Sequence, residues 1–191
     1  MERIAIFASG TGSNAKKIIE YFKAHPNIEV RLVVANKPDA PVLAMAKQQG
    51  VKTLLLDRPG FYQSEGALEA LAEAQITFIV LAGFLWLVPP YLVNAYPNRI
   101  VNIHPALLPK FGGKGMYGMH VHRAVKETGE TNTGITIHLV NEAYDEGDTL
   151  FQVRCPVTAA DTPEQIAAKV RQLEHVHFAP VIEKYINALN S

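Results

Sequence analysis

Cysteine is nearly missing from this sequence, since Cys155 is the only one among 191 residues. A single thiol excludes an internal disulfide framework and a CxxC zinc site. Cys155 sits in the apolar run from Leu150 to Val157, which favours a buried structural thiol over a nucleophile. The sequence also lacks the Gly-x-Ser-x-Gly nucleophile elbow and the Walker phosphate loop. Chemistry that needs a protein-borne thiol or serine nucleophile is therefore disfavoured.

An excess of charge is also absent, because 18 Lys and Arg balance 18 Asp and Glu. We predict no nucleic-acid partner and no membrane partner. No apolar run reaches membrane-spanning length, and we expect no secretory leader. Hydrophobic residues make up 48% of the chain, enough to bury a core. We therefore expect a single domain over 1–191, located in the cytoplasm.

Apolar runs alternate with helical spacings in the first half of the chain. Strands are predicted at 3–8, 30–35, 51–56, 78–82 and 100–103, and helices at 15–22, 41–49, 64–74 and 89–95. The second half contains two strands that read as an antiparallel pair, 134–140 and 150–157, and a broken helical stretch over 162–189. The expected fold is α/β and Rossmann-like, a mostly parallel twisted sheet with helices on both faces and antiparallel strands added in the C-terminal half.

The segment NIHPALLPK at 102–110 carries the clearest chemical signal. It follows a short apolar strand, and Pro105 cannot continue a central ladder. Side chains alternate along a strand, so Asn102 and His104 point to the same side, about 6–7 Å apart. An amide can donate to a developing oxyanion, and an imidazole can deliver a proton near neutral pH. The alternative is a strand that merely ends in polar residues.

The segment SGTGSN at 9–14 joins the first strand to the first helix. Glycines at a helix start form a natural phosphate site. With Ala15 the segment also spells G-x-G-x-x-A, but the second strand ends in Ala-Asn-Lys without the acid that a dinucleotide ribose needs. We therefore favour a monophosphate over NAD, and a plain turn without a ligand remains an alternative.

Two histidine pairs and one acidic turn each have two interpretations, a functional one and a purely structural one. His120 with His122, and His175 with His177, lie in predicted helices, where residues i and i+2 do not share a face. They read as surface or packing histidines rather than as metal ligands. Asp145 lies in an acidic turn between the two late strands. Such acids are usually solvated, but a carboxylate there can also orient a histidine and keep it protonated.

Taken together, these segments resemble the phosphoribosylglycinamide formyltransferases, the folate-dependent enzymes of purine synthesis. The resemblance covers nearly the whole chain. Its anchors are SGTGSN at 9–14, VANK at 34–37, LAGF at 81–84, NIHPALLPK at 102–110, HVHR at 120–123, TGITIH at 133–138 and YDEG at 144–147. It implies a nucleotide-binding half at about 1–100 and a folate-binding, catalytic half at about 101–191.

The resemblance implies that the amine of glycinamide ribonucleotide attacks the formyl carbon of 10-formyltetrahydrofolate, the co-substrate, without a metal. Asn102 would hold the formyl oxygen, His104 would stabilise the oxyanion and protonate N10, and Asp145 would raise the pKa of His104. The residues implied to bind the ribonucleotide are Gly12, Ser13, Asn14 and Glu174. Those implied for folate are Leu85, Trp86, Leu87, Val88, Asn102, Asn141 and Asp145, with His138 in a supporting role. The partners are these two small molecules, and the enzyme would be a monomer or a homodimer.

Three departures from the family pattern stand out. Trp86 replaces a frequent arginine, the segment 112–119 carries extra residues, and Arg171 replaces a smaller polar residue. Related enzymes are the closest rivals. Formyltetrahydrofolate deformylase normally has an additional N-terminal domain, and methionyl-tRNA formyltransferase an additional C-terminal barrel. We expect neither, because Met1 leads directly into the first strand and the chain ends at Ser191. A non-catalytic nucleotide-binding module would need the 10–14 segment alone.

Overall fold

The computed structural model describes residues 1–64 and 66–190, which divide into two compact units, Met1–Val101 and Asn102–Ser191. The strands are β1 (Glu2–Phe7), β2 (Ile28–Ala35), β3 (Lys52–Leu55), β4 (Phe78–Leu81), β5 (Ile100–His104), β6 (Asn132–Leu139) and β7 (Thr149–Pro156). The helices are α1 (Ser13–Phe22), α2 (Pro41–Gln48), α3 (Arg58–Tyr62), α4 (Gly66–Glu73), α5 (Pro90–Ala95), α6 (Met119–Glu127) and α7 (Pro163–Leu189). The boundary between the units falls inside β5.

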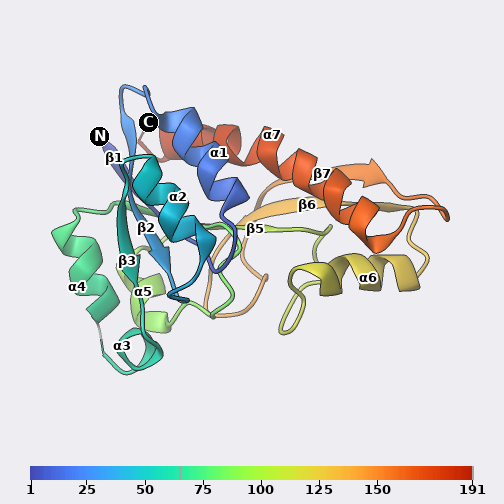
Figure 1. Cartoon of the computed structure of the whole chain (residues 1–191), viewed down its shortest axis with the longest axis horizontal. Coiled ribbons are helices and arrows are strands. Elements are labelled where there is room, and N and C mark those ends of the chain that lie inside the picture. Colours follow the sequence, from blue (N-terminus) through green and yellow to red (C-terminus); the bar gives the residue numbers. More distant parts are fainter. Residues whose placement is uncertain (65, 191) are drawn as a thin grey trace. The chain divides into compact units, whose positions relative to one another are not determined.

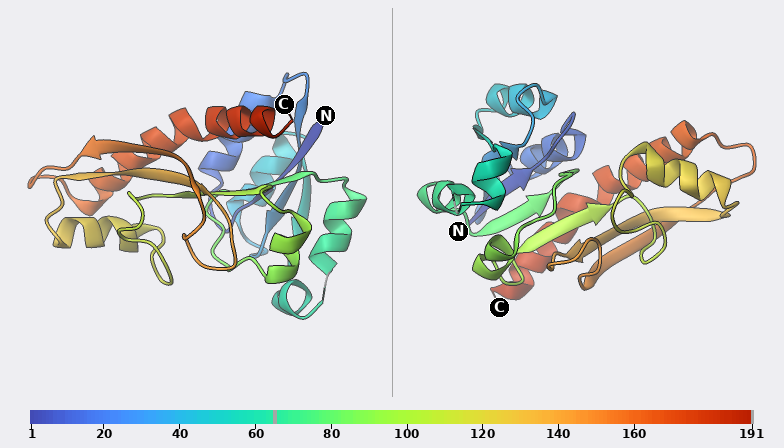
Figure 2. Two further views of the ribbon diagram at one scale, coloured as in Figure 1. Left: turned by 180° about the vertical axis from the view of Figure 1, so that it is seen from behind. Right: turned by 90° about the horizontal axis from the view of Figure 1, so that it is seen from below.

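The first unit is a parallel sheet in the order β3-β2-β1-β4, with the start of β5 next to β4. β1 pairs in parallel with both β2 and β4, and β2 pairs in parallel with β3. Helices α1 and α2 pack on β2 and on each other, in front of the strands in Figure 1. Helix α4 lies on the opposite side (Figure 2), as right-handed crossovers require when the strand order reverses after β3.

The core of the first unit is formed by strands that are apolar on both faces. β4 is buried along its whole length, and so are the last four residues of β1 and of β2. Strands covered on both faces read as continuous apolar runs rather than as alternating ones. The sequence prediction of parallel strands with helices on both faces is confirmed for this unit.

The second unit contains the end of β5 followed by β6 and β7 in the sheet order. β6 and β7 form the predicted antiparallel pair. Helix α7 packs on both strands and on α6, and runs along them in Figure 1. Thr162 Oγ1 accepts from the backbone nitrogen of Gln165, and Gln165 Oε1 accepts from the backbone nitrogen of Thr162. This capping box fixes the start of α7.

The helix predictions need two corrections. The stretch 162–189 is one continuous helix from Pro163, not a broken one, and it contains Pro180. Proline removes only one helix bond, and the buried face of α7 compensates for that loss. Helix α3 was not predicted, although Asp57 accepts a cap bond from Gly60 nitrogen at 2.8 Å. The predicted helix 64–74 includes residue 65, which lies outside the described residues, and α4 begins after it.

Candidate functional site

Asn102 and His104 lie at the carboxyl end of β5, and both reach the same carboxylate. Asn102 Nδ2 donates to Asp145 Oδ1 at 3.3 Å, and His104 Nδ1 lies 3.4 Å from Asp145 Oδ2. The prediction that the two side chains share one side of the strand is confirmed. Asp145 lies in the turn between β6 and β7, as predicted, with a positive φ of 56°.

Asp145 is the centre of a polar cluster within the second unit, which we call the β5 cluster: Asn102, His104, His138 and Asp145. Its Oδ1 lies 3.5 Å from His138 Nε2, and its Oδ2 accepts from Gly113 nitrogen at 3.0 Å. Burial raises the pKa of Asp145. The His138 contact, the charge of His104 and the Gly113 N–H together lower it by more, so the pKa lies below its usual value. The carboxylate is therefore ionised at neutral pH.

His104 lies between two hydrogen-bond acceptors. Its Nδ1 faces Asp145, and its Nε2 lies 2.7 Å from the carbonyl oxygen of Phe111. The side chain is almost fully buried. Burial lowers the pKa of His104, and this outweighs the raising effects of Asp145 and the Phe111 carbonyl. Asp145 raises the pKa of His104, as expected, but burial lowers this pKa by more.

The amide nitrogen of Asn102 is fully used inside the β5 cluster. Besides Asp145 it contacts His138 Nε2 at 3.1 Å, and His138 Nδ1 contacts the Leu139 carbonyl oxygen at 2.7 Å. In the neutral ring, an Nδ1–H given to Leu139 leaves Nε2 to accept from Asn102, whereas the imidazolium also carries an Nε2–H that faces Asp145. With the neutral ring, both N–H groups of the Asn102 amide have partners. Donation from Asn102 to an oxyanion then requires that one of these bonds be released.

The backbone around Phe111 and Gly113 belongs to the site and was not anticipated. Phe111 supplies a carbonyl to His104, and Gly113 supplies an N–H to Asp145. Both groups are main-chain atoms, which residue-type motifs do not reveal. The only sequence signal was the glycine-rich run directly after Pro109.

The predicted phosphate segment lies in the first unit, at the start of α1. Gly12 is the N-cap with φ 75°, and no side chain among the described residues caps the helix there. A Cβ on Gly12 would lie 2.3 Å from Val42 Cγ2. Glycine is therefore required both by the left-handed backbone and by the closeness of α2. Ser13 and Asn14 open the helix, where N–H groups and the dipole favour an anion.

The segment 85–88, predicted to contact the pterin, also lies in the first unit. Leu85 nitrogen donates to Ser9 Oγ at 3.0 Å, which ties this segment to the loop before α1. Leu85 is exposed, Trp86 and Leu87 are half-buried, and Val88 is buried. The Leu87 carbonyl oxygen accepts from Tyr62 Oη at 3.0 Å, so two backbone groups of this segment are tied to neighbouring parts of the first unit.

The remaining candidates also lie in the second unit. Asn141 is exposed, and its Oδ1 accepts from Ala143 nitrogen at 3.0 Å. Glu174 is half-buried on α7. On α6, His122 is buried and His120 exposed, as expected for residues on different helix faces. Within the described residues, no three His, Cys, Asp or Glu side chains gather as a metal site would require.

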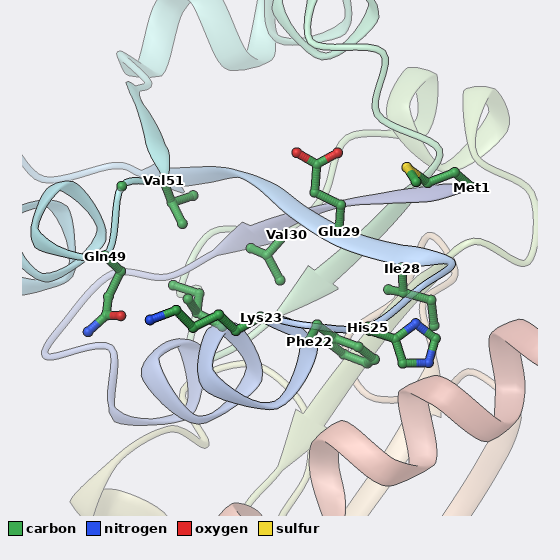
Figure 3. Close-up of a pocket in the computed structure, with 11 residues that line it drawn as sticks. Met1, Phe22, Lys23, His25, Ile28, Glu29, Val30, Gln49 and Val51 are labelled. Carbon is green, nitrogen blue, oxygen red and sulfur yellow. The ribbon is translucent and has the colours of Figure 1, made fainter.

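A hollow of about 340 Å³ in the first unit has none of the candidate residues in its lining. It is lined by residues such as Phe22, Lys23, His25 and Gln49 (Figure 3). These lie at the ends of α1 and α2, beside the amino ends of β2 and β3. Open α/β sheets bind ligands at the carboxyl ends of their strands, so this hollow is not the candidate site.

Every helix within residues 1–64 and 66–190 is too short or too polar to span a membrane.

Comparison with curated proteins finds similar enzymes in a plant and a bacterium. It is 43% identical over 187 residues to the chloroplastic phosphoribosylglycinamide formyltransferase of Arabidopsis thaliana, covering 95% of this chain and 64% of that protein. It is 36% identical over 184 residues to the phosphoribosylglycinamide formyltransferase of Escherichia coli, covering 94% and 84%. The chain therefore spans less than two thirds of the plant relative.

Solved structures agree in fold as well as in sequence. The phosphoribosylglycinamide formyltransferase of Bacillus halodurans superposes with a TM-score of 0.86 at 38% identity, covering 96% of this chain and 94% of that one. The enzyme of the same name from Streptococcus pneumoniae has a TM-score of 0.85 at 37% identity, covering 97% and 99%. The profile of the formyl transferase family matches residues 2–182. The chain belongs to the formyl transferase family.

Proposed function

We propose that this protein transfers the formyl group of 10-formyltetrahydrofolate to the amine of glycinamide ribonucleotide, in purine biosynthesis. The observation that supports this most is the β5 cluster, in which one ionised carboxylate contacts both His104 and Asn102. The relatives from Arabidopsis thaliana and Escherichia coli carry the name of this activity.

In the proposed reaction, the substrate amine attacks the formyl carbon and the carbonyl oxygen becomes an oxyanion. Asn102 and the His104 imidazolium stabilise that negative charge. The tetrahedral intermediate collapses, the bond from carbon to N10 breaks, and His104 gives its proton to N10. The attacking nitrogen loses a proton to water. The nucleophile comes from the substrate, which agrees with the lack of a nucleophilic Ser or Cys motif.

The resemblance to the family supports the roles that we propose for the remaining residues. Gly12, Ser13 and Asn14 bind the ribonucleotide phosphate at the start of α1, and Glu174 contacts the ribose or glycinamide part. The backbone of 85–88 and the turn containing Asn141 bind the pterin. His138 supports Asn102. We further propose a cytoplasmic enzyme that works as a monomer or homodimer, as one catalytic domain, and without a metal.

The experiment that tests this function measures formyl release from 10-formyltetrahydrofolate with and without glycinamide ribonucleotide. The proposal expects product formation only with the ribonucleotide, at a rate unchanged by prior dialysis against EDTA. Equal release in both reactions would identify a hydrolase instead. Transfer to methionyl-tRNA, with none to the ribonucleotide, would also refute the proposal.

A further inference from the structure

Ser9 joins two segments of the first unit that are far apart in the sequence. Its backbone nitrogen donates to the Gly83 carbonyl oxygen at 3.0 Å, and its Oγ accepts from the Leu85 nitrogen at 3.0 Å. We call these two bonds the Ser9 clamp. Ser9 is only 4% exposed, and a hydrogen bond away from water is electrostatically stronger than one in water. The clamp therefore holds both ends of the turn 83–85.

The turn 83–85 depends on this clamp because the strands on either side have already ended. β1 ends at Phe7 and β4 at Leu81. Gly83 is exposed and has a left-handed φ of 77°. The ring of Phe84 packs edge-on against Phe7, with centroids 5.2 Å apart. The turn leads directly into the segment 85–88, so the clamp sets where that segment begins.

On its other side, Ser9 is joined to the start of α1 by the short loop 10–12. The loop is fixed to α2, because the Gly10 carbonyl oxygen accepts from Val42 nitrogen at 3.2 Å and Gly12 lies against the Val42 side chain. Gly10 and Thr11 are exposed. A ligand that orders these two residues at the start of α1 therefore also restricts the motion of Ser9.

The two segments that Ser9 joins are those assigned to the two substrates. Each contains exposed backbone that a ligand must order, and the buried Ser9 connects them. A ligand that orders the shared residues bears their loss of conformational entropy, so the second ligand binds with a smaller loss. Such coupling is reciprocal, because each ligand must change the affinity for the other by the same factor.

We propose that Ser9 is a positioning residue that couples the binding of glycinamide ribonucleotide at the start of α1 to the binding of folate at 85–88. This inference rests on the proposed function for the identity of both ligands. Ser9 acts through Leu85 and through the loop 10–12, and it contacts neither ligand itself. Each ligand raises the affinity for the other by about fivefold, at the lower end of typical couplings.

The test measures four dissociation constants by calorimetry: each ligand alone, and each in the presence of the other at saturation. The folate is an analogue without a transferable formyl group. In the unchanged protein we expect the second ligand to bind about fivefold more tightly than it binds alone. In Ser9→Ala, which removes the acceptor of the Leu85 N–H, we expect the affinity of each ligand alone to change little and the coupling to vanish.

The matched control removes a different serine hydroxyl from the first unit. Ser64 Oγ donates to the Gly60 carbonyl oxygen at 3.0 Å, and Ser64→Ala should keep the full coupling. Ser9→Thr keeps a hydroxyl at the clamp and should retain most of it. A serine with a merely structural role would weaken both ligands when each is measured alone and would leave the ratio of affinities unchanged.

Amide hydrogen exchange tests the clamp without any substitution. In the unchanged protein, glycinamide ribonucleotide alone should slow the exchange of the Leu85 amide, although this ligand does not occupy the segment 85–88. The amides of β4 serve as the internal reference. Unchanged exchange at Leu85, or an unchanged coupling factor in Ser9→Ala, would overturn the proposal.

The formyl-transfer assay keeps this inference separate from the proposed function. Coupled binding that depends on Ser9, without transfer of the formyl group, would refute the proposed function alone. Transfer with independent binding of the two ligands would refute only the role of Ser9. Failure to bind either ligand would refute both.

Discussion

The imidazole Nε2 of His104 lies 2.7 Å from the carbonyl oxygen of Phe111. Because Nδ1 faces the Asp145 carboxylate, both ring nitrogens meet acceptors, and only the imidazolium can donate to both. Burial opposes that charged form. The Phe111 carbonyl also helps to shield His104 from solvent, since the residue is only 3% exposed. A reacting group can reach this imidazole only if the backbone at Phe111 moves.

The segment 112–119 should therefore change its protection when ligands bind. We expect fast amide hydrogen exchange in the free enzyme and slow exchange with glycinamide ribonucleotide and a folate analogue bound together. Gly112, Gly113, Gly115 and Gly118 make its backbone costly to order. The exchange of β4 amides serves as the internal control. Identical exchange of 112–119 with and without ligands would mean a passive surface loop.

Replacing His104 with alanine should nearly abolish transfer while the fold persists. General acid–base help is typically worth about 10²–10⁴-fold in rate. Asp145 keeps its contacts with Gly113, Asn102 and His138 in this variant, so no charge is left unpartnered. Steady-state kinetics and circular dichroism measure the two effects. His25→Ala, at the hollow of the first unit, is the control, and a His104→Ala enzyme with most of its turnover would contradict the assignment.

Replacing Asp145 with asparagine should lower the pKa of His104 further. The carboxylate favours the imidazolium, so its removal makes the acid form scarcer as pH rises. Activity should fall most at neutral and alkaline pH and partly return below the lowered pKa. NMR titration of the His104 ring measures the shift directly, with Asp148→Asn in the same turn as control. A raised pKa would contradict the electrostatic role, and an unchanged one would leave Asp145 as an orienting group.

Replacing Asn14 with aspartate should raise KM for glycinamide ribonucleotide more than KM for the folate. The added charge suits the first turn of α1 and should not unfold the helix, but it repels a phosphate bound there. This variant is sharper than a Gly12 substitution, whose Cβ would clash with Val42 and strain the fold itself. Asn27→Asp, at the opposite end of the sheet, adds the same charge as a control. Equal effects on both KM values would argue against the phosphate placement.

Local patterns predicted the features whose cause is local. The alternation along β5 placed Asn102 and His104 on one side, and Thr162 with Pro163 marked the start of α7. The meeting of Asp145 with His104 is a tertiary event across 41 positions (145 minus 104), and only the family resemblance suggested it. The Phe111 carbonyl and the net lowering of the His104 pKa depend on backbone placement and burial. Neither is encoded in residue type.

The buried His122 on α6 should make folding stability depend on pH. Burial, the positive charge of Arg171 on α7 and the charge of His104 on β5 lower its pKa from 6.5 to about 4, and its Nδ1 has no hydrogen-bond partner among the described residues. The unfolded chain therefore binds a proton at a higher pH than the folded one. The stability that neutral His122 contributes is fully present above its unfolded pKa. It is lost as pH falls from 6.5 towards 4, by roughly 3 kcal/mol in total.

Replacing His122 with leucine should remove this dependence. Urea unfolding at pH 7 and at pH 4.5 should show a smaller loss of unfolding free energy in His122→Leu than in the unchanged protein. The difference between the two pH values carries the argument, because the absolute stability also reflects repacking of the site. His120→Leu, on the exposed face of the same helix, should keep the full dependence. An equal loss in His122→Leu and the unchanged protein would show that the fold does not lower the pKa of His122, because its proton uptake on unfolding vanishes when the pKa is the same in both states.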